Sequence, residues 1–294
     1  MARPWFGSWL VFLLALVGYP TSGLAGDAPL AVVASILPQK YFIERIGGER
    51  VAVSVMVGPG QSPATYEPTP RQMASLSKAV LYFRIGVTFE AVWMDRISAA
   101  NPAMKVIDTQ RGIPLRDIES AGSEKPSATD SGLKDPHVWT HPLLVKIMAG
   151  HIRDALVETD PSHRDDYEKN HAAFAADLDR LDRWIRDLFQ GVRSRRFIVF
   201  HPSWGYFADA YGLTQIPVES AGKEPGPRTL ADLIARGRRE QMRVIFVQQQ
   251  FSRRAAETVA QAIGATVIAV DPLAENYLDN LREVAQAFAA TMQK

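Results

Sequence analysis

The sequence predicts an α/β protein of two lobes, with mainly parallel sheets, bridged by one long α-helix. Short apolar, β-branched runs alternate with amphipathic helical patterns through most of the 294 residues, which is typical of α/β units with parallel sheets. The runs form two sets separated by a long gap, and two sets indicate two lobes. We expect strands at 30–35, 51–56, 79–84 and 105–108, and a second set at 196–200, 214–218, 243–247 and 266–270.

The gap between the two sets has the pattern of a single helix. From His163 to Val192 there is no Pro, and no Gly before Gly191, while large apolar residues recur at steps of three, four and seven. We expect Pro161 to precede this helix and Asp160 to be its N-cap. About 30 residues at a rise of 1.5 Å give roughly 45 Å, enough to run the height of two small lobes.

The first residues are typical of an export signal. Arg3 precedes an apolar run from Trp9 to Gly18, and small residues around Gly23 and Ala25 offer a cleavage site. The run is about ten residues, short of the roughly 20 that span a bilayer. We predict a signal peptide at 1–25, an N-terminal lobe at 26–158, a bridging helix at 159–192 and a C-terminal lobe at 193–294.

The composition narrows the classes of function. The sequence has no cysteine, which excludes a lipid anchor on cysteine and leaves only nitrogen and oxygen ligands for a metal. A net charge of +1 with interspersed signs gives no basic stripe, so we expect no nucleic-acid partner. With the export signal, this predicts a periplasmic protein without stable membrane insertion after cleavage.

A repeated pentapeptide suggests that the two lobes arose by duplication. Glu67-Pro68-Thr69-Pro70-Arg71 opens a helical pattern that leads into the strand at 79–84, and Glu224-Pro225-Gly226-Pro227-Arg228 does the same before the strand at 243–247. The second Pro of each copy suits position N1 of a helix, where its missing N–H costs nothing. We expect the halves to face each other across a cleft.

Three side chains are candidate metal ligands. His201 directly follows the strand at 196–200 and Asp271 the strand at 266–270, and open α/β sheets bind ligands beyond the carboxyl ends of their strands. His137 lies between a polar loop and a predicted helix. Each also has an ordinary interpretation, as a buried imidazole with one hydrogen bond or as a carboxylate that caps the turn at Pro272. Imidazole and carboxylate ligands suit Zn²⁺, Mn²⁺ or Fe²⁺, whereas Ca²⁺ needs more oxygens.

The remaining motifs give no sign of catalysis. His151, His163 and His171 fall on helical patterns among charged residues, and we interpret them as solvated side chains. Ser203 lacks the glycines of a nucleophile elbow. The sequence has no His-Glu-x-x-His, phosphate loop or dinucleotide motif.

Several motifs follow one another along nearly the whole chain. They are Gly58-Pro59-Gly60, Tyr66-Glu67-Pro68-Thr69-Pro70-Arg71, Asp135-Pro136-His137-Val138-Trp139, His201, Gly205-Tyr206, Lys223-Glu224-Pro225-Gly226-Pro227-Arg228 and Asp271-Pro272-Leu273. In this order they resemble a known family, the zinc- and manganese-uptake binding proteins of ABC importers, in their TroA-like helical-backbone class. The resemblance implies a metal between the lobes, bound by His137, His201 and Asp271. It also implies Zn²⁺ or Mn²⁺ as the transported ligand and an ABC transporter membrane permease as the partner, on which the carrier would dock as a monomer.

One position departs from the family's pattern. Family members usually carry a His in the loop before Tyr66, and Ala64 stands there in this chain. Alanine cannot coordinate a metal, so three ligands remain, with a position for water or a nearby oxygen donor. Glu67 is a conceivable substitute, although a carboxylate near a helix N-terminus is the simpler interpretation.

Two other functions stay open. A zinc hydrolase is one, because a His/His/Asp site with an open position could activate water, and Glu67 is then the candidate general base. The other is a family member that has lost metal binding and serves another ligand, which Ala64 favours.

Overall fold

The computed structural model describes Met1 and residues 28–119, 134–219 and 226–292. The predicted signal peptide at 1–25 lies outside these residues, as do Lys223, Glu224 and Pro225 of the second pentapeptide region. The first half contains β1 (Leu30–Ile36), α1 (Leu37–Gly47), η1 (Gly48–Arg50), β2 (Val51–Val57), α2 (Pro70–Leu76), β3 (Leu81–Arg84), α3 (Thr88–Ala100) and β4 (Lys105–Asp108). The middle contains η2 (Val138–Thr140), α4 (Pro142–Thr159), η3 (Pro161–His163) and α5 (Arg164–Leu188). The second half contains β5 (Arg196–Val199), α6 (Gly205–Tyr211), β6 (Thr214–Pro217), α7 (Pro227–Arg239), β7 (Val244–Val247), α8 (Arg253–Ile263), β8 (Thr266–Ala269) and α9 (Tyr277–Met292).

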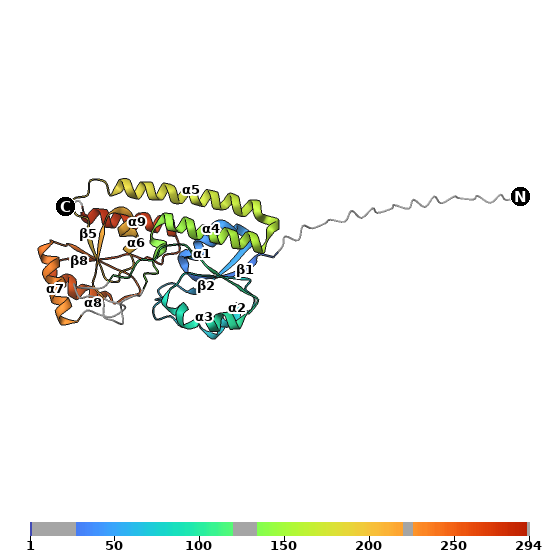
Figure 1. The fold of residues 1–294 in the computed structure, drawn as a ribbon, viewed down its shortest axis with the longest axis horizontal. Coiled ribbons are helices and arrows are strands. Elements are labelled where there is room, and N and C mark those ends of the chain that lie inside the picture. The colour runs from blue at the N-terminus through green and yellow to red at the C-terminus, as the bar shows by residue number, and fades with distance from the viewer. Residues whose placement is uncertain (2–27, 120–133, 220–225, 293–294) are drawn as a thin grey trace.

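The strands form two four-stranded sheets, one in each lobe (Figure 1). Their orders are β2-β1-β3-β4 and β6-β5-β7-β8, and every pair is parallel. In both sheets the second strand of the set is at one edge and the first lies between the second and the third. All eight predicted strands are present, and the two-lobe α/β prediction is confirmed.

The shared order agrees with a duplicated lobe, and so do the two helices that follow the pentapeptides. Pro70 and Pro227 both stand at the start of their helices, α2 and α7, as predicted. Helix α2 is further fixed by a capping box, in which Thr69 Oγ1 accepts from the backbone N–H of Gln72 and the Gln72 side chain accepts from the N–H of Thr69.

Helix α5 is the predicted bridge between the lobes. Its 25 residues pack against α1 and α4 of the first lobe and against α9 of the second (Figure 1). Its buried stripe includes Tyr167, Phe174, Leu178 and Ile185, in the predicted period. It ends at Leu188, before the predicted limit of Val192.

The start of α5 differs from the prediction. A short 3₁₀ turn, η3, comes first, so the α-helix begins at Arg164 with His163 as its N-cap. The Asp160 carboxylate does not cap the backbone. It accepts hydrogen bonds from the side chains of Ser162, His163 and Tyr167, and these local donors compete successfully with the backbone N–H groups.

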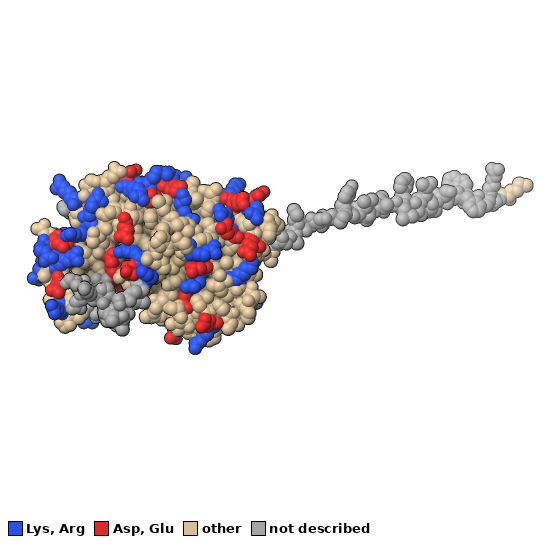
Figure 2. Space-filling view, in the orientation of Figure 1, with Lys and Arg blue, Asp and Glu red and all other residues tan. Residues whose placement is uncertain are grey.

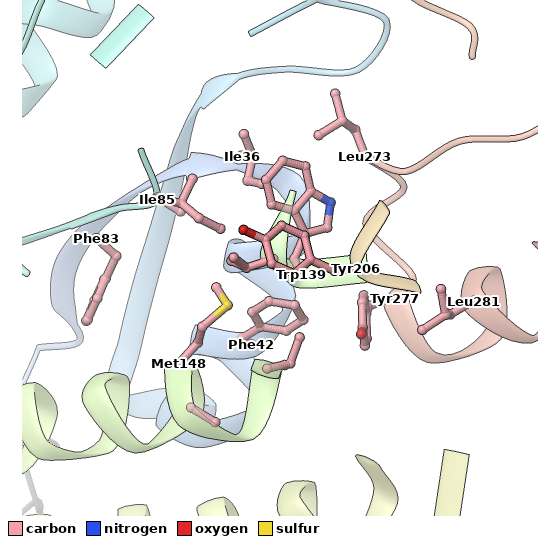
Figure 3. Packing of buried hydrophobic residues seen from close by; sticks show 14 of the residues in the cluster. Ile36, Phe42, Phe83, Ile85, Trp139, Met148, Tyr206, Leu273, Tyr277 and Leu281 are labelled. Carbon is pink, nitrogen blue, oxygen red and sulfur yellow. The ribbon is translucent and has the colours of Figure 1, made fainter. Parts of the chain in front are cut away.

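Among the described residues, one hydrophobic cluster runs through both lobes (Figure 3), and a smaller one lies within the second lobe. Phe42 of α1 and Tyr277 of α9 meet edge to face, with ring centroids 4.9 Å apart. The Trp139 indole N–H donates to the carbonyl of Pro272 at 2.7 Å, which joins η2 to the segment after β8. The lobes are therefore packed on each other along the helical side of the molecule.

The surface carries both signs of charge. Lys, Arg, Asp and Glu are interspersed over most of the visible face, and Lys and Arg are densest at the end that carries α7 (Figure 2). None of the helices that the structure describes is both long enough and apolar enough to cross a membrane.

Candidate metal site

His137 is held in a buried turn of the first half of the chain. Pro136 precedes it and fixes the approach of the chain, and Val138 and Trp139 of η2 follow as fully buried residues. The centroids of the Trp139 and His137 rings are 5.1 Å apart. Only 9% of His137 is exposed. The burial of the two residues that follow His137 therefore fixes the position of its imidazole.

His201 lies two residues beyond the carboxyl end of β5, in the second lobe. Its backbone N–H donates to Gln248 Oε1 at 3.3 Å, and its carbonyl accepts from Gln248 Nε2 at 2.7 Å. Its ring is stacked on Phe251, with centroids 4.7 Å apart. Gln248 and Phe251 both follow β7, the strand next to β5, so residues beyond the ends of two neighbouring strands orient this imidazole.

The two imidazoles meet, and their Nε2 atoms are 3.4 Å apart. Each ring has its other nitrogen on a buried carboxylate: His137 Nδ1 donates to Asp135 Oδ1 at 2.7 Å, and His201 Nδ1 donates to Glu219 Oε1. A carboxylate accepts only, so each Nδ1 carries a hydrogen, and in the neutral ring Nε2 then has the free lone pair. Two lone pairs are thus directed at one small space.

The spacing of these nitrogens fits a metal ion. Nitrogens bound at about 2.05 Å to a tetrahedral Zn²⁺ lie about 3.3 Å apart, close to the observed separation. The carboxylate–imidazole pairs are also the outer contacts that metal-binding histidines ordinarily make.

The environment keeps His201 in its metal-binding form. Burial lowers the pKa of His201, and the nearby His137 lowers it further, while the hydrogen bond to Glu219 opposes both effects. The net direction is downward, so the neutral imidazole is favoured. Neutral imidazole is the form that binds a metal.

Asp271 lies two residues beyond β8 and is held in the turn before Leu273. Its Oδ1 accepts from the Leu273 backbone N–H at 2.9 Å and from Gln250 Nε2 at 3.3 Å. It lines a cavity of about 160 Å³ to which Gly58, Pro59 and Gly60 of the first lobe also contribute. Within the described ranges, no three His, Asp or Glu side chains lie close enough together to hold one ion. The structure thus brings His137 and His201 together without grouping Asp271 with them, and its role as a third ligand stays a prediction.

Ala64 and Glu67, on which the two alternative functions depend, are both exposed. Ala64 follows Pro63 in a turn, with its N–H on Ser62 Oγ at 3.3 Å. Glu67 lies in the segment that leads into α2.

The histidines interpreted as solvated are more enclosed than predicted. His151 Nδ1 lies 3.1 Å from the Thr109 carbonyl, and His163 Nδ1 lies 2.6 Å from Asp160 Oδ2. His171 is half-buried beside Arg153. Helix packing against neighbouring segments covers these rings, which a helical pattern in one segment does not reveal.

Sequence reasoning missed the two carboxylates behind the imidazoles. Asp135 stands two residues before His137, and its short side chain can fold back onto that residue's backbone N–H, as it does at 3.0 Å. Glu219 follows β6 at the same sheet edge from which His201 was identified. The strand-end rule, applied to every strand of the second set, would have found it.

Comparisons with known proteins agree with this architecture. The chain matches the ZnuA family model, described as the periplasmic component A of the zinc-uptake complex, over residues 32–291. It is 27% identical over 283 residues to the high-affinity zinc uptake system protein ZnuA of Bacillus subtilis strain 168, covering 90% of this chain and 87% of that protein. It is 25% identical over 305 residues to the manganese-binding lipoprotein MntA of Halalkalibacterium halodurans, covering 98% of each. A crystal structure of ZnuA superposes with a TM-score of 0.84 at 42% identity, covering 90% of this chain and 99% of that one.

Proposed function

The chain belongs to the ZnuA family of periplasmic zinc-uptake components, and from this premise we propose that it is the substrate-binding protein of an ABC importer for a divalent transition metal, zinc or manganese. The single observation that carries the proposal is the pair of Nε2 atoms 3.4 Å apart, each backed by a buried carboxylate. Such a pair can hold a cation and release it when the lobes or the permease disturb the geometry.

The proposed ligands are His137, His201 and Asp271. The imidazoles bind through Nε2, and their Nδ1–H groups stay on Asp135 and Glu219. The Asp271 carboxylate, in the cavity between the lobes, supplies an oxygen ligand after it leaves Gln250. Because Ala64 offers no donor, the fourth position belongs to water or another oxygen.

A carrier of this kind acts as a periplasmic monomer that docks on its permease, and it needs no catalytic residue. In the hydrolase alternative, Glu67 would have to act as general base on metal-bound water. A turnover screen with generic esters, amides and phosphoesters on zinc-loaded protein distinguishes the two, since a carrier turns over none of them.

The proposal is tested by calorimetry on metal-stripped protein. Zn²⁺ and Mn²⁺ are titrated into the wild-type protein, the His137→Ala and His201→Ala variants, and His171→Ala as a matched control away from the site. We expect the wild type and the control to bind and each site variant to lose the heat of binding. Absence of heat from both metals with the wild type, or undiminished binding by the variant that combines His137→Ala with His201→Ala, would refute the assignment.

A further inference from the structure

We propose that Arg116 is a positioning residue of the metal site. Its guanidinium occupies a notch that is open only because residue 205 is glycine, and from there it holds the Asp135 carboxylate and, through it, the His137 imidazole. The inference rests on the proposed function, because it assumes that His137 binds the metal.

The notch is defined by the missing side chain of Gly205, the first residue of α6. A Cβ added there would lie 1.8 Å from Arg116 Nη1 and 2.9 Å from Asp135 Oδ2. The two charged atoms are therefore no more than 4.7 Å apart, the sum of these distances. Any larger residue at position 205 would have to displace the guanidinium.

The two atoms are buried, and each lacks a hydrogen bond. Within the residues that the structure describes, neither Arg116 Nη1 nor Asp135 Oδ2 has a hydrogen-bond partner, although the guanidinium is already paired with Glu119 through Nη2. A buried donor or acceptor that is left unsatisfied costs free energy. Arg116 and Asp135 make no direct ion pair, and a separation of at most 4.7 Å suits one bridging water that would satisfy both atoms.

Backbone contacts fix the same residues to α6. The Arg116 N–H donates to the Tyr206 hydroxyl at 3.1 Å, and that hydroxyl donates to the Asp135 carbonyl at 2.8 Å. The Asp135 N–H donates to the Arg116 carbonyl at 2.9 Å. Arg116 Nε also lies 3.5 Å from Asp209 of α6. These contacts hold the segment that carries His137 against α6. Because α6 begins only four residues after His201, the same helix helps to fix the positions of both imidazoles.

This arrangement orients both oxygens of Asp135. Oδ1 accepts from the backbone N–H and from Nδ1 of His137, and Oδ2 lies no more than 4.7 Å from Arg116 Nη1, so in the proposal the guanidinium restrains the carboxylate and thereby the direction of the imidazole. Loss of such an outer contact typically weakens metal affinity about 10- to 100-fold.

The test compares Arg116→Ala, Gly205→Ala and the double variant. Zinc affinity is measured by competition with a chromogenic chelator, and the melting temperature of each metal-free protein is measured in parallel. Gly150→Ala is the matched control, because Gly150 is also in a helix and an added Cβ there meets nothing within 4 Å. We expect each single variant to weaken zinc affinity about 10- to 100-fold, and the control not to change it.

The double variant separates positioning from general destabilisation. Once Arg116 is truncated, the alanine at position 205 no longer meets the guanidinium, and only its 2.9 Å contact with Asp135 Oδ2 remains. We therefore expect the double variant to lose less zinc affinity than the two single variants do in sum. Arg116→Lys, which keeps a charge near Asp135, should recover part of the affinity. Additive losses, or single variants within twofold of the wild type, would overturn the inference.

His201→Ala distinguishes this failure from that of the proposed function. If His201→Ala loses zinc while the Arg116 and Gly205 variants bind normally, only the role of Arg116 is wrong. If His201→Ala itself binds zinc normally, the site is wrong, and the inference is wrong with it.

Discussion

At the scale of single residues, the two buried carboxylates decide what the histidines can do. Asp135 and Glu219 are 1% and 2% exposed, and each accepts from the Nδ1 of one imidazole. Without them either nitrogen could carry the hydrogen, and an Nε2–H would repel a cation. The carboxylates also supply negative charge close to the cation, which strengthens each imidazole as a ligand.

Restoring the imidazole that the family's pattern places in the first loop should tighten zinc binding. In Ala64→His the new side chain extends from the loop whose Gly58 and Gly60 line the cavity that holds Asp271. A fourth ligand replaces water, and we expect zinc affinity to rise about tenfold or more, which corresponds to about 1.4 kcal/mol. Chelator competition measures the change. Ala74→His, on the exposed face of α2, is the control, and equal affinities for the two variants would contradict the prediction.

The sequence made some of the site predictable and left the rest open. The strand-end rule led to His201, which the structure brings beside His137, and to Asp271, whose role as a ligand stays a prediction; the rule depends only on where a buried run stops. The meeting of His201 with His137, which is 64 residues away, depends on how the lobes pack, and no spacing in the chain encodes that. The roles of Arg116 and Gly205 were not predictable for the same reason, because their contact joins a loop of the first half to a helix of the second.

At the scale of elements, the junction of α4 and α5 shows how a local polar cluster sets a helix boundary. Asp160 accepts from Ser162, His163 and Tyr167, and the first turn after Pro161 is 3₁₀ instead of α-helical. The apolar period predicted α5 well because burial against α4 and α9 decides it. The residue at which α5 begins depends on three side-chain hydrogen bonds to Asp160, and the apolar period of a sequence does not predict such bonds.

This cluster should contribute stability that depends on pH. Burial raises the pKa of Asp160, but the hydrogen bonds from Ser162, Tyr167 and His163 outweigh it and lower the pKa from 3.8 to about 2. The folded pKa is below the unfolded one, so the contribution is complete above pH 3.8 and is lost as the pH falls toward 2. We expect Asp160→Asn to lower the free energy of unfolding by about 1 to 2 kcal/mol at pH 7.

Urea unfolding at pH 7 and pH 3 measures this difference. The gap between Asp160→Asn and the wild type should narrow at the lower pH, because at pH 3 the carboxylate of the unfolded wild-type chain is largely protonated and folding has to release that proton. Asp95→Asn, at an exposed position of α3, should change little at either pH. A gap that is the same at both pH values would show that the charge of Asp160 has no part in the junction.

At the scale of the whole molecule, the shared core limits how far the lobes can move. Phe42 of α1, Phe174 of α5 and Tyr277 of α9 belong to one buried cluster, and α5 packs on helices of both lobes. Opening the cleft widely would separate Phe42 from Tyr277 and expose both rings to water. Small rearrangements of the cleft loops remain available to a carrier that has to take up and release an ion.

Solution scattering tests this rigidity. We expect the radius of gyration of the metal-free and zinc-loaded protein to agree within about 1 Å, as for binding partners that change little in shape. The reason is that the core contacts are independent of the metal. A contraction of several ångströms on zinc addition would indicate a hinge that the shared core does not allow.

The central claim is that one cation binds between the imidazoles of His137 and His201. Anomalous diffraction at the zinc edge, from crystals of zinc-loaded protein, tests it most directly. We predict a single strong peak about 2.0 to 2.1 Å from both Nε2 atoms, with Nδ1 of each ring still on its carboxylate. A peak bonded to neither imidazole would contradict the account.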